Sequence, residues 1–256
     1  MKIASWNINS LRKRQERLLV WLRETSPDVV CLQETKCTDE QFPAASLRDA
    51  GYAATFHGQK SYNGVAILTK KEPREVRIGF CDEVEDDQAR IIAASIGDVR
   101  VISIYAPNGQ AVGSAAYHYK MEWYRRLTNC LRTRERALER VVLCGDFNVA
   151  PNDADVHDPA LWRGAIMCSE GERAAFHLLV EIGLADTLRL HHPEPGIFSW
   201  WDYRMLSFPK NRGLRIDAIL AGGELAGKCS AGGVDREMRK GKDPSDHAPV
   251  WAEFGS

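Results

Sequence analysis

Long apolar segments are absent from this sequence of 256 residues. No stretch approaches the roughly 20 apolar residues that a membrane-spanning helix needs. The opening residues, MKIASWNINSLRKR, also lack the apolar core of a secretion signal. We therefore predict a cytoplasmic protein without a membrane partner. We also predict a monomer.

An excess of charge of one sign is lacking as well, since 34 Lys and Arg oppose 35 Asp and Glu, a formal net charge of -1. A dedicated non-specific DNA binder is usually more basic, so any DNA site must lie on a local face. The seven cysteines form no CxxC pair, which argues against a zinc site. Cys31 and Cys144 lie in apolar runs and should be buried. This cysteine usage is typical of a reducing compartment.

Short segments rich in Val and Ile alternate with longer amphipathic segments, which predicts an α/β fold. Strands are predicted at Lys2–Asn7, Asp28–Gln33, Gly64–Thr69, Arg90–Ile96, Val99–Tyr105, Arg140–Cys144, Leu214–Leu220 and Ala248–Phe254. Helices are predicted at Leu11–Glu24, Tyr119–Glu139 and Glu172–Ile182. No repeat or linker divides the chain. We therefore expect one domain over residues 1–256, with a mixed sheet or two packed sheets.

Carboxylates and carboxamides stand at or near the ends of several predicted strands. They are Asn7 and Asn9, Glu34, Asp146 with Asn148, Asp217, and Asp246 followed by His247. Ligands bind at such strand ends in α/β sheets. An oxygen-rich group of this kind suits Mg²⁺, which takes one or two carboxylates and keeps waters or phosphate oxygens.

Each of these residues also has an ordinary structural interpretation. The Gly145–Asn148 segment is compatible with a simple turn, and Glu34 or Asp246 with a helix cap. His247 alone is compatible with a surface histidine. Asp217 differs because it lies among apolar residues, where a buried charge needs a partner, and His247 is the candidate.

Seven short motifs together resemble the exonuclease III family of DNA repair nucleases, in that family's order and over nearly the whole chain. They are Trp6–Arg12, Leu32–Lys36, Asn63–Ala66, Tyr105–Asn108, Gly145–Asn148, Gly213–Asp217 and Ser245–Val250. The resemblance implies a four-layer α/β sandwich, in which two mixed sheets pack back to back with helices outside.

The resemblance also implies a Mg²⁺-dependent phosphodiesterase in which Mn²⁺ can substitute. Glu34 is then the main metal ligand, helped by Asn7 and Asp246, with Asp217 a further metal candidate. Asp146 activates the attacking water beside Asn148, whose amide donates to the phosphate. Protonated His247, positioned by Asp217, holds a phosphate oxygen. Tyr105 donates its hydroxyl to the phosphate or the leaving group, and a metal or supporting role for Asn9 stays open.

Double-stranded DNA is the partner that the resemblance implies, and in a prokaryote this would associate the protein with the nucleoid. Candidate DNA-binding residues are Arg12, Tyr62, Asn63, Arg90, Asn108, Trp200, Arg204 and Leu214. Lys13 and Arg14 beside Arg12 are further phosphate contacts, unless this segment is only a solvated helix start. The aromatic residues near Trp200 suit an unstacked sugar or base, or else pack in the core, as at least one of Trp200 and Trp201 should.

The predicted function is a DNA repair nuclease acting on 3′ ends, abasic sites or both. Superfamily phosphatases of inositol lipids, sphingomyelin-cleaving enzymes and an inactive binding module are the alternatives. In relatives, an apolar pocket matching Trp200, Leu214 and Ile216 takes the flipped abasic sugar. Met167, where some relatives carry glycine, would crowd that pocket, and the loop at 109–113 lacks a long wedge residue. We therefore hypothesise a bias towards 3′-end processing, unless Met167 simply packs in the core.

Overall fold

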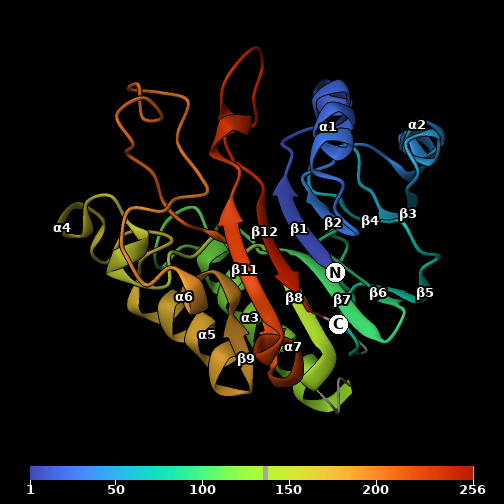
Figure 1. The fold of residues 1–256 in the computed structure, drawn as a ribbon. Coiled ribbons are helices and arrows are strands. Elements are labelled where there is room, and N and C mark those ends of the chain that lie inside the picture. Colours follow the sequence, from blue (N-terminus) through green and yellow to red (C-terminus); the bar gives the residue numbers. More distant parts are fainter. Residues whose placement is uncertain (83, 135–137, 256) are drawn as a thin grey trace.

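Two six-stranded β-sheets lie face to face in this computed structural model, which describes residues 1–82, 84–134 and 138–255 (Figure 1). The first sheet runs β11 (Cys229–Val234), β12 (Val250–Phe254), β1 (Lys2–Asn7), β2 (Val29–Gln33), β4 (Val65–Thr69) and β3 (Ala53–His57). The second runs β5 (Arg74–Ile78), β6 (Ile91–Ile96), β7 (Val99–Tyr105), β8 (Val141–Asp146), β10 (Asp217–Gly222) and β9 (Leu184–Asp186).

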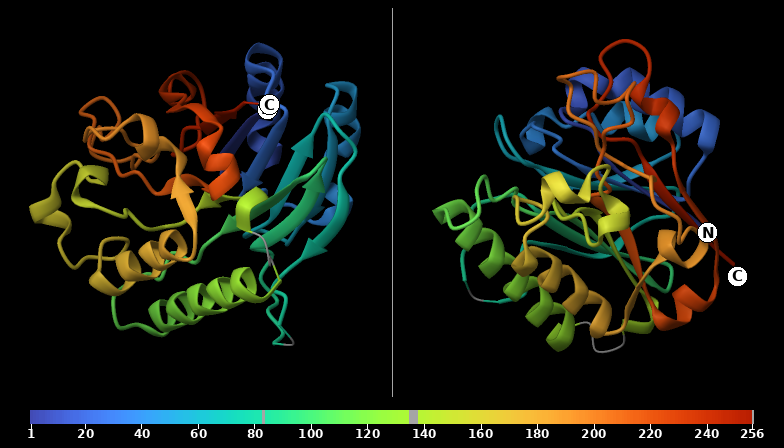
Figure 2. Two further views of the ribbon diagram at one scale, coloured as in Figure 1. Left: turned by 60° about the horizontal axis from the view of Figure 1, so that its bottom comes forward. Right: turned by 90° about the vertical axis from the view of Figure 1, so that its left-hand side faces the viewer.

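Helices cover the outer face of each sheet and complete four layers (Figure 2). One side carries α1 (Leu11–Thr25) and α2 (Ala44–Asp49), and the other carries α3 (Ala115–Arg134) and α5 (Glu170–Glu181). The shorter helices are α4 (Pro159–Trp162), α6 (Thr187–His191) and α7 (Gly223–Gly227). The predicted α/β sandwich of two packed mixed sheets is confirmed.

The central strands are apolar along their whole length, and this explains the layering. Successive side chains point to opposite faces, so a strand buried on both faces must be apolar on both. Ile3, Val29, Val101 and Val142 point into the core between the sheets, whereas their neighbours pack against the helices. The two parallel pairs, β1 with β2 and β7 with β8, form the centre of their sheets.

The pairing directions bring the polar strand ends to one edge. Strands β1 and β8 end at Asn7 and Asp146. Strand β10 runs antiparallel to β8, so its first residue, Asp217, lies opposite Asp146. Strand β12 runs antiparallel to β1, so His247, just before it, returns to the same edge. The edge therefore gathers residues that are up to 240 positions apart in the chain.

The structure departs from the sequence predictions mainly at the sheet edges. Strands β3, β5, β9 and β11 were not predicted, and β10 begins at Asp217 and not at Leu214. Helix α3 begins four residues earlier than predicted and ends at Arg134; residues 135–137 of the predicted helix lie outside the described residues.

A disulfide joins Cys81 and Cys130, a pairing that the scattered cysteines did not predict. Cys31 and Cys144 are buried, as predicted. In the part of the chain that the structure describes, no helix combines the length and the apolar character needed to cross a membrane.

Candidate active site

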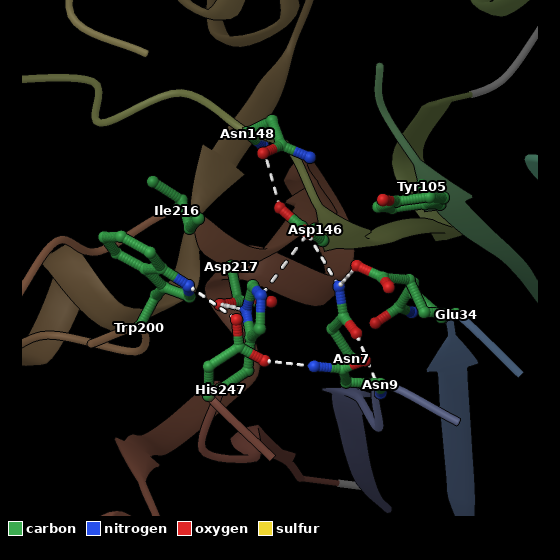
Figure 3. Close-up of polar contacts among 12 residues, drawn as sticks. Asn7, Asn9, Glu34, Tyr105, Asp146, Asn148, Trp200, Ile216, Asp217 and His247 are labelled. Atoms are coloured by element: carbon green, nitrogen blue, oxygen red, sulfur yellow. Dashed lines mark hydrogen bonds and ion pairs between the residues drawn. The ribbon is translucent and has the colours of Figure 1, made fainter. Parts of the chain in front are cut away.

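Asn7 links the two sheets at the centre of the polar edge (Figure 3). Its side chain is fully buried, and its Nδ2 donates to Glu34 Oε1 at 2.8 Å and to Asp146 Oδ2 at 2.9 Å. Glu34 follows β2 of the first sheet, and Asp146 ends β8 of the second. One amide therefore sets the separation of two carboxylates that come from different sheets.

Glu34 stands in a left-handed backbone conformation, with φ of 51°, which turns its side chain into the edge. The Lys36 ammonium lies 2.7 Å from Glu34 Oε2 and donates to Asn9 Oδ1 at 2.7 Å. Among the described residues, one group of three acids and histidines could hold a metal ion, namely Glu34, Asp146 and His247. Their ligand atoms lie within 4.8 Å of one another.

Asp146 is almost completely buried and is held by hydrogen bonds on both oxygens. The backbone N–H of Asn148 donates to Oδ1 at 2.8 Å, while Asn7 donates to Oδ2. Burial, opposed by His247 but helped by the nearby Asp217 carboxylate, raises the pKa of the Asp146 carboxyl above its ordinary value. This carboxyl group is therefore a better proton acceptor than an exposed aspartate.

His247 and Asp217 form a buried pair, with Nδ1 2.8 Å from Asp217 Oδ2. This contact directs the other ring nitrogen, Nε2, towards Asp146 Oδ2, 3.8 Å away. Burial disfavours the charged imidazole, but the carboxylates of Asp217 and Asp146 outweigh it and raise the pKa of His247. The histidine is therefore a cation at neutral pH. Ser199 Oγ accepts from the Asp217 N–H at 3.0 Å, and Ser245 Oγ accepts from the His247 N–H at 3.2 Å.

Tyr105, the last residue of β7, faces the same group (Figure 3). Burial, together with the charges of Glu34 and Asp146, raises its pKa well above the ordinary value, so its hydroxyl stays protonated. The Arg90 guanidinium lies 4.6 Å from the Tyr105 ring centre and donates to the Tyr105 carbonyl at 3.0 Å. Arg90 therefore supports the tyrosine directly.

Asp246 lies beside this group but its two oxygens are already engaged. Oδ1 accepts from Asn9 Nδ2 at 2.8 Å, and Oδ2 accepts from Trp200 Nε1 at 3.0 Å. Asp217 is more deeply buried; Oδ2 contacts His247, and Oδ1 has no hydrogen-bond partner among the described residues. Of the four predicted metal candidates, these two are therefore already engaged by other side chains, Asp246 by Asn9 and Asp217 by His247.

The candidate DNA-binding residues are placed differently from one another. Arg12 and Arg204 are exposed, although Arg204 pairs with Asp202 at 2.7 Å, and Tyr62 is 72% exposed. Asn63 is buried, and its Nδ2 donates to Gln59 at 2.8 Å.

Asn108 reaches the active-site loops directly, because its Nδ2 donates to Asn148 Oδ1 at 3.2 Å. Asn148 in turn donates from Nδ2 to the Ala106 carbonyl at 2.9 Å. These two amides join the loop after β7 to the loop after β8.

Two more of the residues that were candidates for DNA contact are buried. The Arg14 guanidinium is turned inward and donates to the carbonyls of Asn9, Asp243 and Pro244, so it is not presented to a phosphate. Leu214 has no exposed surface.

Leu214 packs in one apolar cluster with Ile216 and Trp200, the other two predicted pocket walls, and Met167 belongs to the same cluster. Trp201 is the tryptophan that packs in the core, fully buried.

Comparisons with known proteins agree with this arrangement. The model of the endonuclease/exonuclease/phosphatase family matches residues 4–247. The chain belongs to this family. It is 39% identical to exodeoxyribonuclease III of Haemophilus influenzae, over 99% of this chain and 100% of the relative. The resemblance to exonuclease III is therefore confirmed, and the protein is a hydrolase of this type.

Two solved structures of family members superpose over the full length of both chains. One is the 3′ phosphatase NExo (D146N) from Neisseria bound to a product DNA hairpin, with a TM-score of 0.98 and 43% identity. The other is an AP endonuclease from Archaeoglobus fulgidus, with a TM-score of 0.95 and 39% identity. A 3′ phosphatase and an AP endonuclease thus share this fold, and each is similar to this chain to about the same degree.

Sequence reasoning missed several residues that shape the site. Lys36 and Ser245 lie within two of the seven motifs, Leu32–Lys36 and Ser245–Val250, so a polar side chain inside a motif was the signal that could have found them. Ser199 supports Asp217 but lies in an unmarked segment. Lys120 and Glu172 lie on predicted helices, where a charged residue normally faces solvent, and both are fully buried.

Proposed function

We propose that this protein is a Mg²⁺-dependent DNA repair nuclease that hydrolyses the bond between phosphorus and the 3′ oxygen. The convergence of Glu34, Asp146 and His247 around Asn7 carries the proposal. Removal of a 3′-terminal nucleotide, removal of a 3′ phosphate and cleavage beside an abasic sugar all break that bond, so one set of residues serves all three reactions.

Glu34 and Asn7 fit a magnesium ion because they carry oxygen atoms that can act as ligands, and because the site already accommodates a positive charge. The Lys36 ammonium lies among oxygens of Glu34 and Asn9. Glu34 would be the main ligand, with Asn7 beside it, and Mn²⁺ would substitute. Asp246 and Asp217 would act indirectly: Asp246 would orient Asn9, and Asp217 would orient His247. When bound, the ion would neutralise phosphoryl charge and stabilise the leaving oxygen.

Asp146 accepts a proton from the attacking water, as its raised pKa allows. His247 donates from Nε2 to a non-bridging phosphate oxygen. This is possible because Asp217 Oδ2 accepts the hydrogen bond from Nδ1 and the Asp217 carboxylate keeps the ring charged. Asn148 and the protonated Tyr105 hydroxyl add neutral donors from the opposite side (Figure 3). Donors preset around developing charge account for much of the rate of such enzymes.

Exposed basic and aromatic residues around this edge, and the buried Asn63 beside them, would contact the DNA. Arg12 and Arg204 would hold phosphates, and Tyr62 with Asn63 would hold the backbone. Arg90 would act through Tyr105.

Replacing Arg12 by alanine should weaken DNA binding and flatten the dependence of log Kd on log salt by about one unit, because one phosphate contact is lost. Fluorescence anisotropy with a labelled duplex at several salt concentrations measures the slope. Arg23→Ala, also exposed and at the far end of helix α1, should leave the slope unchanged. Equal slopes for all three proteins would place the DNA elsewhere.

We further propose a bias towards 3′-end processing, set by Met167. Its side chain is buried against Leu214 and Ile216, where an extrahelical abasic sugar would have to enter. A terminal nucleotide needs less unstacking than an internal one. The similarity to the AP endonuclease from Archaeoglobus fulgidus favours abasic-site cleavage as the second candidate activity.

The nuclease and its bias are tested together by measuring the cleavage rates of three duplexes, which carry a recessed 3′ end, a 3′ phosphate or an internal abasic site. Each duplex is incubated with the protein in Mg²⁺ and then in EDTA. Met167→Gly should raise abasic cleavage relative to 3′-end removal by about tenfold, because pocket bulk discriminates by such amounts. Glycine also tolerates the φ of 69° at this position. Met167→Leu, which keeps the bulk, is the matched control. Wild-type protein that cuts the abasic duplex fastest would overturn the bias, and inactivity on all three duplexes would overturn the nuclease.

Residues 1–256 would form one catalytic domain, since both sheets contribute to one site. We propose that the enzyme works as a monomer in the cytoplasm, close to the nucleoid DNA if the cell is prokaryotic. Gel filtration with light scattering tests the monomer.

A further inference from the structure

Lys120, on helix α3, is fully buried although its side chain ends in an ammonium group. Its Nζ contacts acceptors from three separate segments: the carbonyl of Asn148 at 2.7 Å, the carbonyl of Asn108 at 3.2 Å, and Glu172 Oε1 at 2.5 Å. An ammonium group has three protons, so all its donors are used.

Glu172, on helix α5, completes the connection because it is also fully buried. Its Oε1 accepts from the Met167 N–H at 3.0 Å, and its Oε2 accepts from the Ser169 N–H at 3.1 Å and the Ser169 hydroxyl at 2.6 Å. The ion pair of Lys120 and Glu172 therefore ties together the loops after β7, after β8 and before α5.

These loops hold strained backbone at positions that matter for the reaction. Asn148 has φ of 50° and Met167 has φ of 69°, in the left-handed region that non-glycine residues rarely adopt. While Lys120 holds the Asn148 carbonyl, the Asn148 N–H donates to Asp146 Oδ1 (Figure 3). The two loops also touch directly, because the Ala150 N–H donates to the Met167 carbonyl at 2.8 Å.

A purely stabilising role explains this pair poorly. Removing two charges from water is unfavourable, and apolar replacements of buried ion pairs are often neutral or stabilising. Burial indeed lowers the pKa of Lys120, against the opposing charge of Glu172. Such a pair is better explained by the specific backbone geometry that it imposes.

We propose that Lys120 and Glu172 are positioning residues that couple the end of β8 and the loop after it, which bear Asp146 and Asn148, to the segment before α5 that bears Met167. The inference rests on the proposed nuclease function. One ion pair then sets both the orientation of the general base and the shape of the substrate pocket, so that rate and substrate preference change together when it is broken.

Glu172→Gln and Lys120→Met test the coupling. Each should lower kcat on a recessed 3′ end by about 10- to 100-fold, as loss of supporting contacts typically does, with KM changed less than about twofold. Each should also change the ratio of abasic cleavage to 3′-end removal, whereas general destabilisation would scale both rates equally. In an Asp146→Asn background the further loss of kcat should be much smaller, because Lys120 acts by orienting that base through the main chain of Asn148.

Arg126→Met is the matched control, since Arg126 is on the same helix and pairs with Asp82 at 2.8 Å, away from these loops. It should leave kcat and the substrate ratio unchanged at temperatures well below Tm. If Lys120→Met does not fold, the near-isosteric Glu172→Gln keeps the test.

Hydrogen exchange separates this inference from the proposed function, because it needs no activity. In Glu172→Gln, amides of both residues 147–150 and 167–169 should lose protection together. Unchanged exchange in either segment, or unchanged kcat and substrate ratio in a folded and active protein, would overturn the coupling. An inactive wild-type protein would overturn the nuclease, and the exchange data would still decide the coupling.

Discussion

Replacing Asp146 by asparagine is expected to lower kcat by about 10²- to 10⁴-fold, the usual contribution of a general base. The amide keeps the size of the side chain and can still accept from the Asn148 N–H, but it cannot take a proton from water. Affinity for a 3′-phosphorylated duplex should stay within a few-fold of wild type, because Asp146 is buried and the exposed contacts remain. Single-turnover cleavage and anisotropy measure the two effects separately.

The same substitution should not unfold the protein. Folding raises the pKa of Asp146 to about 7. The folded protein is therefore destabilised as the pH rises from the ordinary pKa of an aspartate to about 7, because the buried carboxyl group must ionise. Its Tm at pH 8 should therefore be no lower than that of wild type, while Asp217 continues to hold His247. Asp49→Asn, an exposed acid at the end of helix α2, should change neither rate nor Tm. A folded Asp146→Asn protein within about tenfold of the wild-type rate would assign the base elsewhere.

Replacing Glu34 by glutamine is expected to reduce cleavage at least about a hundredfold at low Mg²⁺, because the site loses the negative charge of its main metal ligand. DNA affinity in EDTA should change little. Mg²⁺ should also increase the free energy of unfolding of wild type, by about 2.7 kcal/mol at 100 times its Kd, and so raise the Tm. This increase should be lost in the variant.

The control for Glu34 is Glu237→Gln, because Glu237 is an exposed acid that pairs with Lys240 at 2.8 Å. It should retain both the Mg²⁺-dependent rate and the Mg²⁺-dependent Tm. A Glu34→Gln protein that cleaves at nearly the wild-type rate in saturating Mg²⁺ would show that the metal is held by other residues.

The central strands were predictable because burial on both faces leaves a continuous apolar run. Strands β1 and β7 match the predicted bounds, and β2, β4 and β6 differ by one residue at the start. The edge strands were not predictable in this way. Strand β5 is largely exposed, and β11 contains Gly232 and Gly233, so neither shows an apolar pattern.

The residues of the polar edge could be predicted because each follows or begins an apolar strand. Asn7, Glu34 and Asp146 were selected for this reason, whereas Asp217 was selected as an acid among apolar residues; the order of the motifs indicated the family. Their roles in the reaction stay predictions until the variants are measured. The orientation of Arg14 was not predictable, because only the fold brings Asp243 and Pro244 against the first helix.

The sequence by itself therefore determined the fold class, the family and the identity of the polar residues, because strand periodicity and short motifs are local properties of the chain. The tertiary structure alone decided which of these residues touch. Asn7 meets Asp146 across 139 positions, and Lys120 meets Glu172 across 52. Such contacts depend on strand direction and on the packing of two sheets, and buried charges take whatever partners that packing supplies.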